Sequence, residues 1–442
     1  MFIRFFRGIF LSLILIIEGE IKISKFIRFF RGIFLSLILI IEGLEYEYFT
    51  FDQIIKFPLI FLSISLIPPT IIAFNQKSFL SSGEKGNLVF TCFLMLLIVF
   101  WVDSIWFFFI FFELSVVPML LIVSSVGGTK SRIEARKFLF TFTSGTSLIF
   151  LLFLVWRRTL INWETFIWLP SPSQNLSNFF NFFLSFLILL TFFVKIPSLF
   201  VHIWLPKAHV EAPVFGSIIL ARVMLKIGGY GILLFRPLLD FFFSSFFPPF
   251  FFICFSAYSA IICFRQKDLK ILIAYSRVNH MALVLIASIQ GWRLGFFGLL
   301  LLMLGHGVIS SILFFLARRS YGQTSSRSLI VFSSRGKDYF LILMWIVFAF
   351  INIGFPPFLN FLGEVYIIKV VAFNPFLFLT SIFNFFIVGL YGVLIISSIT
   401  QRKSQKYSII NRSGGLREFI ILMVLMGHIY CFLILNMIKG VF

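Results

Sequence analysis

Apolar stretches of about 20 residues, the length that a helix needs to cross a lipid bilayer, recur along this 442-residue chain. Hydrophobic residues make up 60% of the sequence and charged residues 12%. A water-soluble protein of this length could not bury so much apolar surface. Barrel strands alternate apolar and polar residues, and the unbroken runs at Phe90–Val102 and Leu294–Leu316 exclude that class. The sequence therefore predicts an all-α polytopic membrane protein.

The net charge of +20 is explained by lysine and arginine residues that gather in loops on one side of the membrane. Nucleic-acid binding would need a soluble basic face, and the chain has no polar stretch longer than a loop. The cysteines lie in apolar runs without CxxC or Cys/His spacing, so we expect no metal site, iron–sulfur cluster or disulfide. They are Cys92, Cys254, Cys263 and Cys431.

A perfect repeat opens the chain, because Phe2–Gly19 recurs unchanged at Phe26–Gly43. The repeat stops after two copies, which argues against a solenoid and leaves a recent duplication or an error in the gene sequence. We divide the chain into the duplicated segment 1–50, a membrane core 51–400, and a loop with a final helix at 401–442. With both copies the chain has about 14 spans by length and hydropathy. The others are expected near 54–74, 87–102, 105–123, 138–155, 179–200, 211–235, 241–264, 269–289, 293–316, 338–371, 375–399 and 417–438.

Ionisable residues inside these spans are the candidate functional site, because a charge at the bilayer centre is costly without a partner, water or a function. They are Glu113, Lys195, Lys226, His280, His306 and Glu364. Glu113 and Lys195 have opposite charges at similar predicted depth and are candidates for a buried ion pair. Lys226 has no carboxylate partner in its own span, which suits a lysine that gains and loses protons. Histidines can relay protons near neutral pH.

Structural explanations remain open for single members of this set. A buried Glu or Lys can belong to a structural pair, and His280 and His306 can be packing or hydrogen-bonding residues. We expect His202 and His209 at the membrane interface, and Arg277 to extend its side chain towards a nearby loop. The placement of acids, lysines and histidines on separate spans favours an ion path over purely structural pairing.

Helix breaks accompany these charges. Pro118 follows Glu113, Pro197 follows Lys195, and Gly228–Gly229 follows Lys226. The segment 338–371 is too long for one straight helix, and we expect Pro356–Pro357 to break it. Interrupted helices near the bilayer centre expose backbone polar groups to a transported ion.

One long block carries a specific resemblance to a known family. FFVKIPSLFVHIWLPKAHVEAPVFGSIILARVMLKIGGYGILLFRP at 192–237 resembles the NADH dehydrogenase subunit 4 family, the antiporter-like membrane subunits of respiratory complex I. Further matches are FFELSVVPML around Glu113, KDLKILIAYSRVNHMALVLI at 267–286, LGHGVISSILFFLARRSYGQTSSRS at 304–328 and GFPPFLNFLGE at 354–364. The resemblance covers about 85–400 and leaves out the repeated N-terminus.

The resemblance implies 14 helices with two inverted five-helix repeats, each containing one broken helix. By position, Glu113 and Lys195 match the family's charge pair in one half-channel, and Lys226 matches the lysine on the central axis. His280 and His306 match polar residues of that axis, and Glu364 matches the carboxylate on the second broken helix. These residues would form a proton relay.

The implied function is proton translocation as a subunit of NADH:ubiquinone reductase, with the redox chemistry in other subunits and no cofactor in this chain. The implied partners are other membrane-arm subunits in a hetero-oligomer and lipids including cardiolipin, in the mitochondrial inner membrane. Two alternatives remain, a cation/proton antiporter subunit and a scaffold that does not pump. Phe215 and Arg222 depart from the family's small residues. Arg222 lies one helical turn before Lys226, where it would repel a charged ammonium group.

Overall fold

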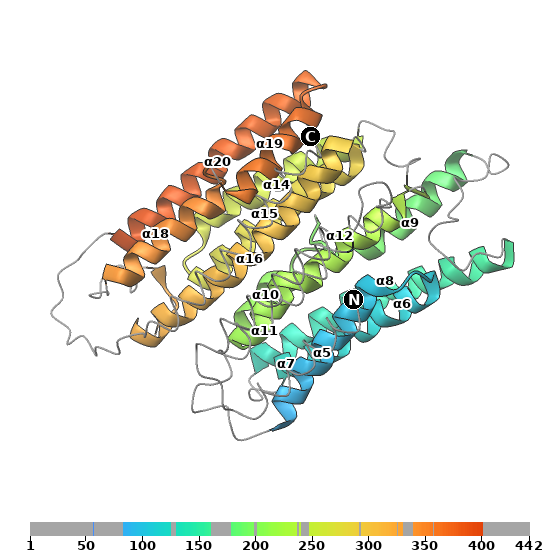
Figure 1. The fold of residues 1–442 in the computed structure, drawn as a ribbon, viewed down its shortest axis with the longest axis horizontal. Helices are drawn as coiled ribbons and strands as arrows, with labels where there is room; N and C mark the ends of the chain where they lie inside the picture. The colour runs from blue at the N-terminus through green and yellow to red at the C-terminus, as the bar shows by residue number, and fades with distance from the viewer. Residues whose placement is uncertain are drawn as a thin grey trace, which may run out of the picture. The chain divides into compact units, whose positions relative to one another are not determined.

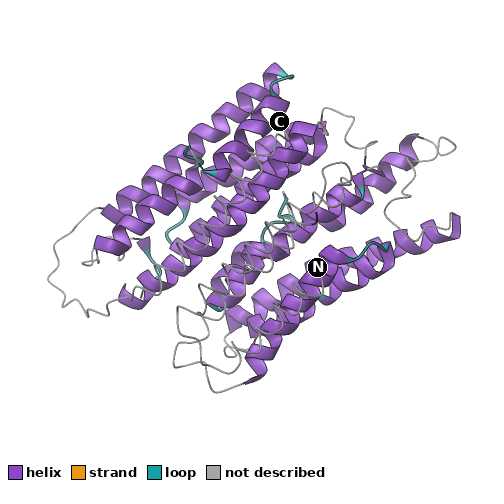
Figure 2. Cartoon of the chain, viewed as in Figure 1, coloured by secondary structure: helices purple, strands orange, loops and turns teal. Residues whose placement is uncertain are grey.

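The computed structural model describes residue 56 and residues 83–124, 130–160, 178–198, 201–236, 238–239, 247–290, 293–324, 326–329, 339–356 and 358–400. These residues all belong to one compact unit, Lys56–Phe442. Within them the regular structure is helical apart from isolated bridge residues, which include the bridge between Asp268 and Ser328 (Figure 2). The repeat and the last predicted span lie outside the described residues, and so does the first predicted span after the repeat, apart from residue 56.

The first helices lie close to the predicted spans, and Figure 1 labels them along the chain. The span at 105–123 contains a one-residue interruption at Ser115, because Pro118 has no N–H with which to bond the carbonyl of the preceding turn. The bounds are α5 (Gly83–Trp101), α6 (Ile105–Leu114), α7 (Val116–Ser124), α8 (Lys130–Leu160) and α9 (Asn178–Lys195).

The central segment combines a short helix with a buried one. The helix α9 ends at Lys195, two residues before Pro197, and α10 (Trp204–Glu211) begins after an irregular stretch. α11 (Val214–Ile219) then continues through a π-helical turn, η3 (Leu220–Met224), into α12 (Leu225–Leu234).

The later helices include the predicted break at the double proline. α18 (Tyr339–Ile353) and α19 (Leu359–Val371) divide the long segment 338–371, as expected. The other helices are α14 (Phe247–Arg265), α15 (Leu269–Gln290), α16 (Arg293–Thr324) and α20 (Pro375–Thr400).

Seven helical segments in the described part of the chain are long and apolar enough to span a membrane. Phe215–Leu234 is buried along its whole length, whereas less than half of Lys130–Val155 and of Pro375–Thr400 is buried. Apolar surface of this extent on long helices is suited to lipid or to neighbouring subunits. The chain is therefore an all-helical, multi-pass membrane protein.

Glycines allow the central helices to approach one another closely. A Cβ atom at Gly228 would lie 2.8 Å from Cγ1 of Ile196, and one at Gly231 would lie 2.2 Å from the Phe192 ring. α12 therefore packs tightly on the end of α9. The expectation that Gly228–Gly229 interrupts the helix is wrong, because α12 runs through both residues and uses them for packing.

Candidate functional site

Lys226 occupies the centre of the buried region. Its side chain is fully buried, and Nζ donates a hydrogen bond of 3.2 Å to the carbonyl oxygen of Ala221. Ala221 lies in the π-helical turn η3, which holds one residue more per turn than an α-helix does. The turn thus provides a backbone acceptor for an ammonium group inside the protein.

Two arginines lie within electrostatic range of Lys226. Arg222 lies in η3 and its side chain is 1% exposed. It acts electrostatically on Lys226, as its spacing of four residues predicted. Arg277 on α15 is 0% exposed, so the expectation that it extends towards a loop is wrong. The three cations are held on two neighbouring segments, and like charges so close together repel each other.

Arg277 is instead fixed by an aromatic and a histidine. Its Nη1 lies 2.6 Å from Nε2 of His209, and its guanidinium carbon lies 4.8 Å from the centre of the Phe314 ring. His209 stacks on the same ring at 4.9 Å. Both His209 and His202, at 0% and 8% exposure, are buried in the protein, and their position at the membrane interface stays a prediction. The side chain of Arg277 therefore points inward, and it is long enough to reach His209 on α10.

Glu113 and Lys195 form the first charged group, which we call the Glu113–Lys195 pair. Each acts electrostatically on the other, and the Ser147 side chain also acts on Glu113. Nζ of Lys195 lies 3.5 Å from the carbonyl oxygen of Phe112 and 4.2 Å from the centre of its ring. The predicted direct ion pair is not formed, since no contact within 4 Å joins these two described residues.

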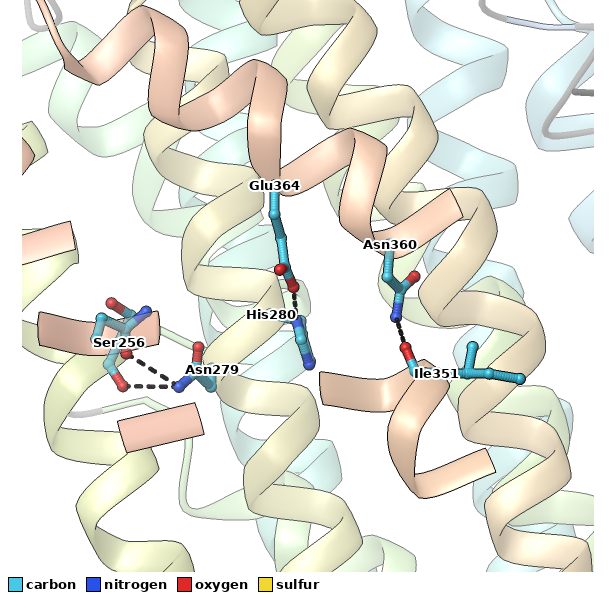
Figure 3. A network of polar contacts seen from close by, with 7 residues as sticks. Ser256, Asn279, His280, Ile351, Asn360 and Glu364 are labelled. Atoms are coloured by element: carbon cyan, nitrogen blue, oxygen red, sulfur yellow. Dashed lines mark hydrogen bonds and ion pairs between the residues drawn. The ribbon is translucent and has the colours of Figure 1, made fainter. Parts of the chain in front are cut away.

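The second charged group combines residues of α15, α16 and α19, and we call it the His306–His280–Glu364 cluster. The rings of His280 and His306 lie 4.8 Å apart between centroids. Nδ1 of His280 lies 3.5 Å from Oε1 of Glu364, as Figure 3 shows. All three side chains are buried. Lys226 acts electrostatically on both histidines, which connects the cluster to α12.

Buried asparagines next to this cluster were not predicted from the sequence. Nδ2 of Asn279 donates to the carbonyl oxygen of Ser256, a bond drawn in Figure 3, at 3.2 Å. It also donates to Oδ1 of Asn384 at 3.2 Å. Asn360 on α19 donates to the carbonyl oxygen of Ile351 at 3.4 Å. An amide side chain in an apolar helix is costly without partners, so these asparagines carried a signal that was available in the sequence.

The cluster brings together side chains that can bind and release protons, although the ring nitrogens of both histidines and Oε1 of Glu364 form no hydrogen bond within the described residues. An imidazole ring and a carboxylate can each bind and release a proton, and a buried lysine can do so at its own site. The described residues include no group of three or more His, Cys, Asp or Glu side chains placed to share a metal ion. The role of the six residues in proton transfer stays a prediction.

Comparisons with known proteins identify the family of this chain. The family described as NADH:quinone oxidoreductase/Mrp antiporter, TM matches residues 103–390. NADH-ubiquinone oxidoreductase chain 4 of Artemia franciscana is 34% identical over 312 residues, which cover 70% of this chain and 76% of the relative.

Two solved structures share the fold. A chain of respiratory complex I from Thermus thermophilus with bound NADH aligns with a TM-score of 0.72 and 20% identity, covering 86% of this chain and 79% of that chain. A chain of the membrane-bound sulfane sulfur reductase, an archaeal respiratory membrane complex, aligns with a TM-score of 0.74 and 17% identity, covering 86% and 81%. At these identities they establish the antiporter-like fold of complex I membrane subunits. On the sequence matches, the chain belongs to the NADH-ubiquinone oxidoreductase chain 4 family.

Proposed function

We propose that this chain is a proton-translocating membrane subunit of respiratory complex I. The observation that carries the proposal is the buried series from Lys226 through His306 and His280 to Glu364. It joins α12, α15, α16 and α19 through side chains that can exchange protons. Membership in the NADH-ubiquinone oxidoreductase chain 4 family supports the same function.

The chain would act as one subunit of an NADH:ubiquinone reductase whose redox reaction takes place elsewhere. We propose that it lies in the mitochondrial inner membrane, among other membrane-arm subunits and lipids including cardiolipin, and carries no cofactor. We further propose the full set of about 14 helices with two inverted repeats, each of which contains a broken helix. The interruptions after α9 and α18 support this arrangement.

The test is to replace Lys226 by alanine in the assembled complex within sealed vesicles. We expect proton pumping per NADH oxidised to fall about tenfold, because the relay loses its central proton carrier. Lys137, an exposed lysine on α8, provides the control, and Lys137→Ala should pump normally. Unchanged pumping by Lys226→Ala would show that Lys226 is not part of the relay.

A cation/proton antiporter is the second candidate, because the matching family also includes Mrp antiporters. Purification from membranes distinguishes the two. A complex I subunit should co-purify with NADH-oxidising subunits, whereas an antiporter subunit should be isolated without them. A scaffold that does not pump would co-purify in the same way and would tolerate Lys226→Ala.

A further inference from the structure

Gly354 ends α18 in a conformation that favours glycine. Its φ angle is +87°, in the left-handed region. Its N–H donates to the carbonyl oxygen of Ile351 at 3.2 Å, and the N–H of Phe355 donates to that of Phe350 at 3.2 Å. The rings of Phe350 and Phe355 also pack at 5.8 Å. These contacts form a complete Schellman cap, which fixes where the chain leaves the helix.

The same glycine lies directly against the Glu364 carboxyl group. A Cβ atom added at Gly354 would lie 2.3 Å from Oε2, 2.9 Å from Cδ and 3.1 Å from Oε1. Contacts this short cannot exist, so any side chain at this position would force the carboxyl group to move. A cap alone requires only the left-handed conformation, and it does not require this empty space.

α19 contacts the end of α18 at two points on one face. Asn360 lies one helical turn before Glu364 and donates to the carbonyl oxygen of Ile351, which the cap also uses. Glu364 then fills the space beside Gly354 and lies 3.5 Å from Nδ1 of His280 (Figure 3). The carboxyl group is therefore held between the backbone of α18 and the imidazole ring.

We propose that Gly354 is a positioning residue of the proton relay, which holds the Glu364 carboxylate at His280 by leaving no side chain between them and the end of α18. The proposal rests on the proposed function, because it assigns this role within the same relay. In the step concerned, the N–H bond at Nδ1 of protonated His280 breaks and an O–H bond forms at Oε1 of Glu364. The end of α18 carries a partial negative charge, which attracts the proton to this place.

Two substitutions at Gly354 distinguish the effect of filling the space beside Glu364 from the effect of disturbing the helix cap. Asparagine tolerates the left-handed conformation, so Gly354→Asn keeps the cap and adds a Cβ atom, whereas Gly354→Ala adds the atom and strains the backbone. In the assembled complex, we expect both variants to pump about tenfold fewer protons per NADH, because a displacement of about 1 Å impairs a positioned reaction. Gly322→Ala on α16 is the matched control, since a Cβ atom there meets nothing within 4 Å. Normal pumping by Gly354→Asn would overturn the proposal.

Shortening the carboxylate tests the mechanism in a second way. In a Glu364→Asp background the carboxyl group is drawn back from Gly354, so adding Gly354→Asn should change pumping by less than about twofold. An equal loss in both backgrounds would mean that Gly354 acts only through the fold and would also overturn the proposal. Glu364→Gln tests the proposed function separately, because normal pumping by this variant would remove Glu364 from the relay whatever Gly354 does.

Discussion

The Glu113–Lys195 pair and the His306–His280–Glu364 cluster differ in how their charged groups meet. Glu113 and Lys195 act on each other without a direct contact, and the ammonium group lies on the backbone and ring of Phe112. In the cluster, His280 and Glu364 lie 3.5 Å apart and the two imidazole rings lie 4.8 Å apart. Coulomb energy changes slowly with distance, whereas a proton transfer needs close and oriented groups. The pair should therefore tolerate changes in length that the cluster does not.

The largest effect should follow removal of the acid in the cluster. Glu364→Gln keeps the shape but binds no transferable proton, and we expect proton pumping per NADH to fall about 100-fold. The measurement is the pH change outside sealed vesicles during NADH oxidation. Glu134→Gln, at an exposed position on α8, should leave pumping unchanged. If both variants pumped equally, the contact in the cluster would have no part in proton transfer.

Shortening both acids compares the two groups directly. Glu364→Asp should lower pumping about tenfold, because it opens the contact with His280. Glu113→Asp should lower it by less, about fivefold at most, because a change of 1 Å beyond 4 Å alters the Coulomb energy by less than about 1 kcal/mol in a medium of dielectric constant about 20. Parallel assays of the two variants in the same vesicles give the ratio. A larger loss for Glu113→Asp would reverse the comparison.

A substitution at Arg277 tests whether repulsion between its buried charge and Lys226 destabilises the protein. Arg277→Met keeps most of the volume and removes the repulsion, and we expect a gain in stability of about 1 kcal/mol after the lost bond to His209. The temperature at which the assembled complex loses activity measures it. Arg277→Lys keeps the charge and should give no gain, and Arg265→Met, at an exposed site, should have little effect. A lower inactivation temperature for Arg277→Met would mean that the bond to His209 outweighs the repulsion.

The smallest effect should come from the ion pair between Arg132 and Glu211. This partly exposed pair provides a reference for the buried contacts. Their closest atoms lie 3.7 Å apart and their side chains are 21% and 19% exposed. A double-mutant cycle with Arg132→Met and Glu211→Gln should give a coupling of about 0.5 kcal/mol or less. Thermal inactivation again provides the measurement. A coupling above 2 kcal/mol would place this pair among the buried contacts.

The sequence was sufficient for the membrane class, for most helix positions and for the break in 338–371. Apolar length and proline act locally, and these features follow from short stretches of residues. Hydropathy also located the six ionisable residues, because each stands out in an apolar run. The partner of each residue depends on which helices meet, and no local pattern gives that.

Arg277 and the π-helical turn illustrate what could not be predicted. The distance of Arg277 from a loop suggested an interfacial position, but its reach to His209 depends on α10 crossing α15. The extra residue in the turn η3 follows from packing. A π-helical turn has no characteristic amino-acid composition that would indicate it in a sequence. Asn279 and Asn360 differ, because their polarity in apolar spans was visible and only their partners were hidden.

The close crossing of α16 and α19 has a mechanical consequence. Gly305, next to His306, faces Asn360, and Gly363, next to Glu364, lies against the backbone at Leu302. The two main chains meet beside His306 and Glu364, so neither helix can slide without breaking these contacts. The backbones of α16 and α19 are therefore held at a fixed separation, which sets the distance between His306 and Glu364. Motion at this point of the proposed relay would then involve rotation of side chains and not sliding of α16 against α19.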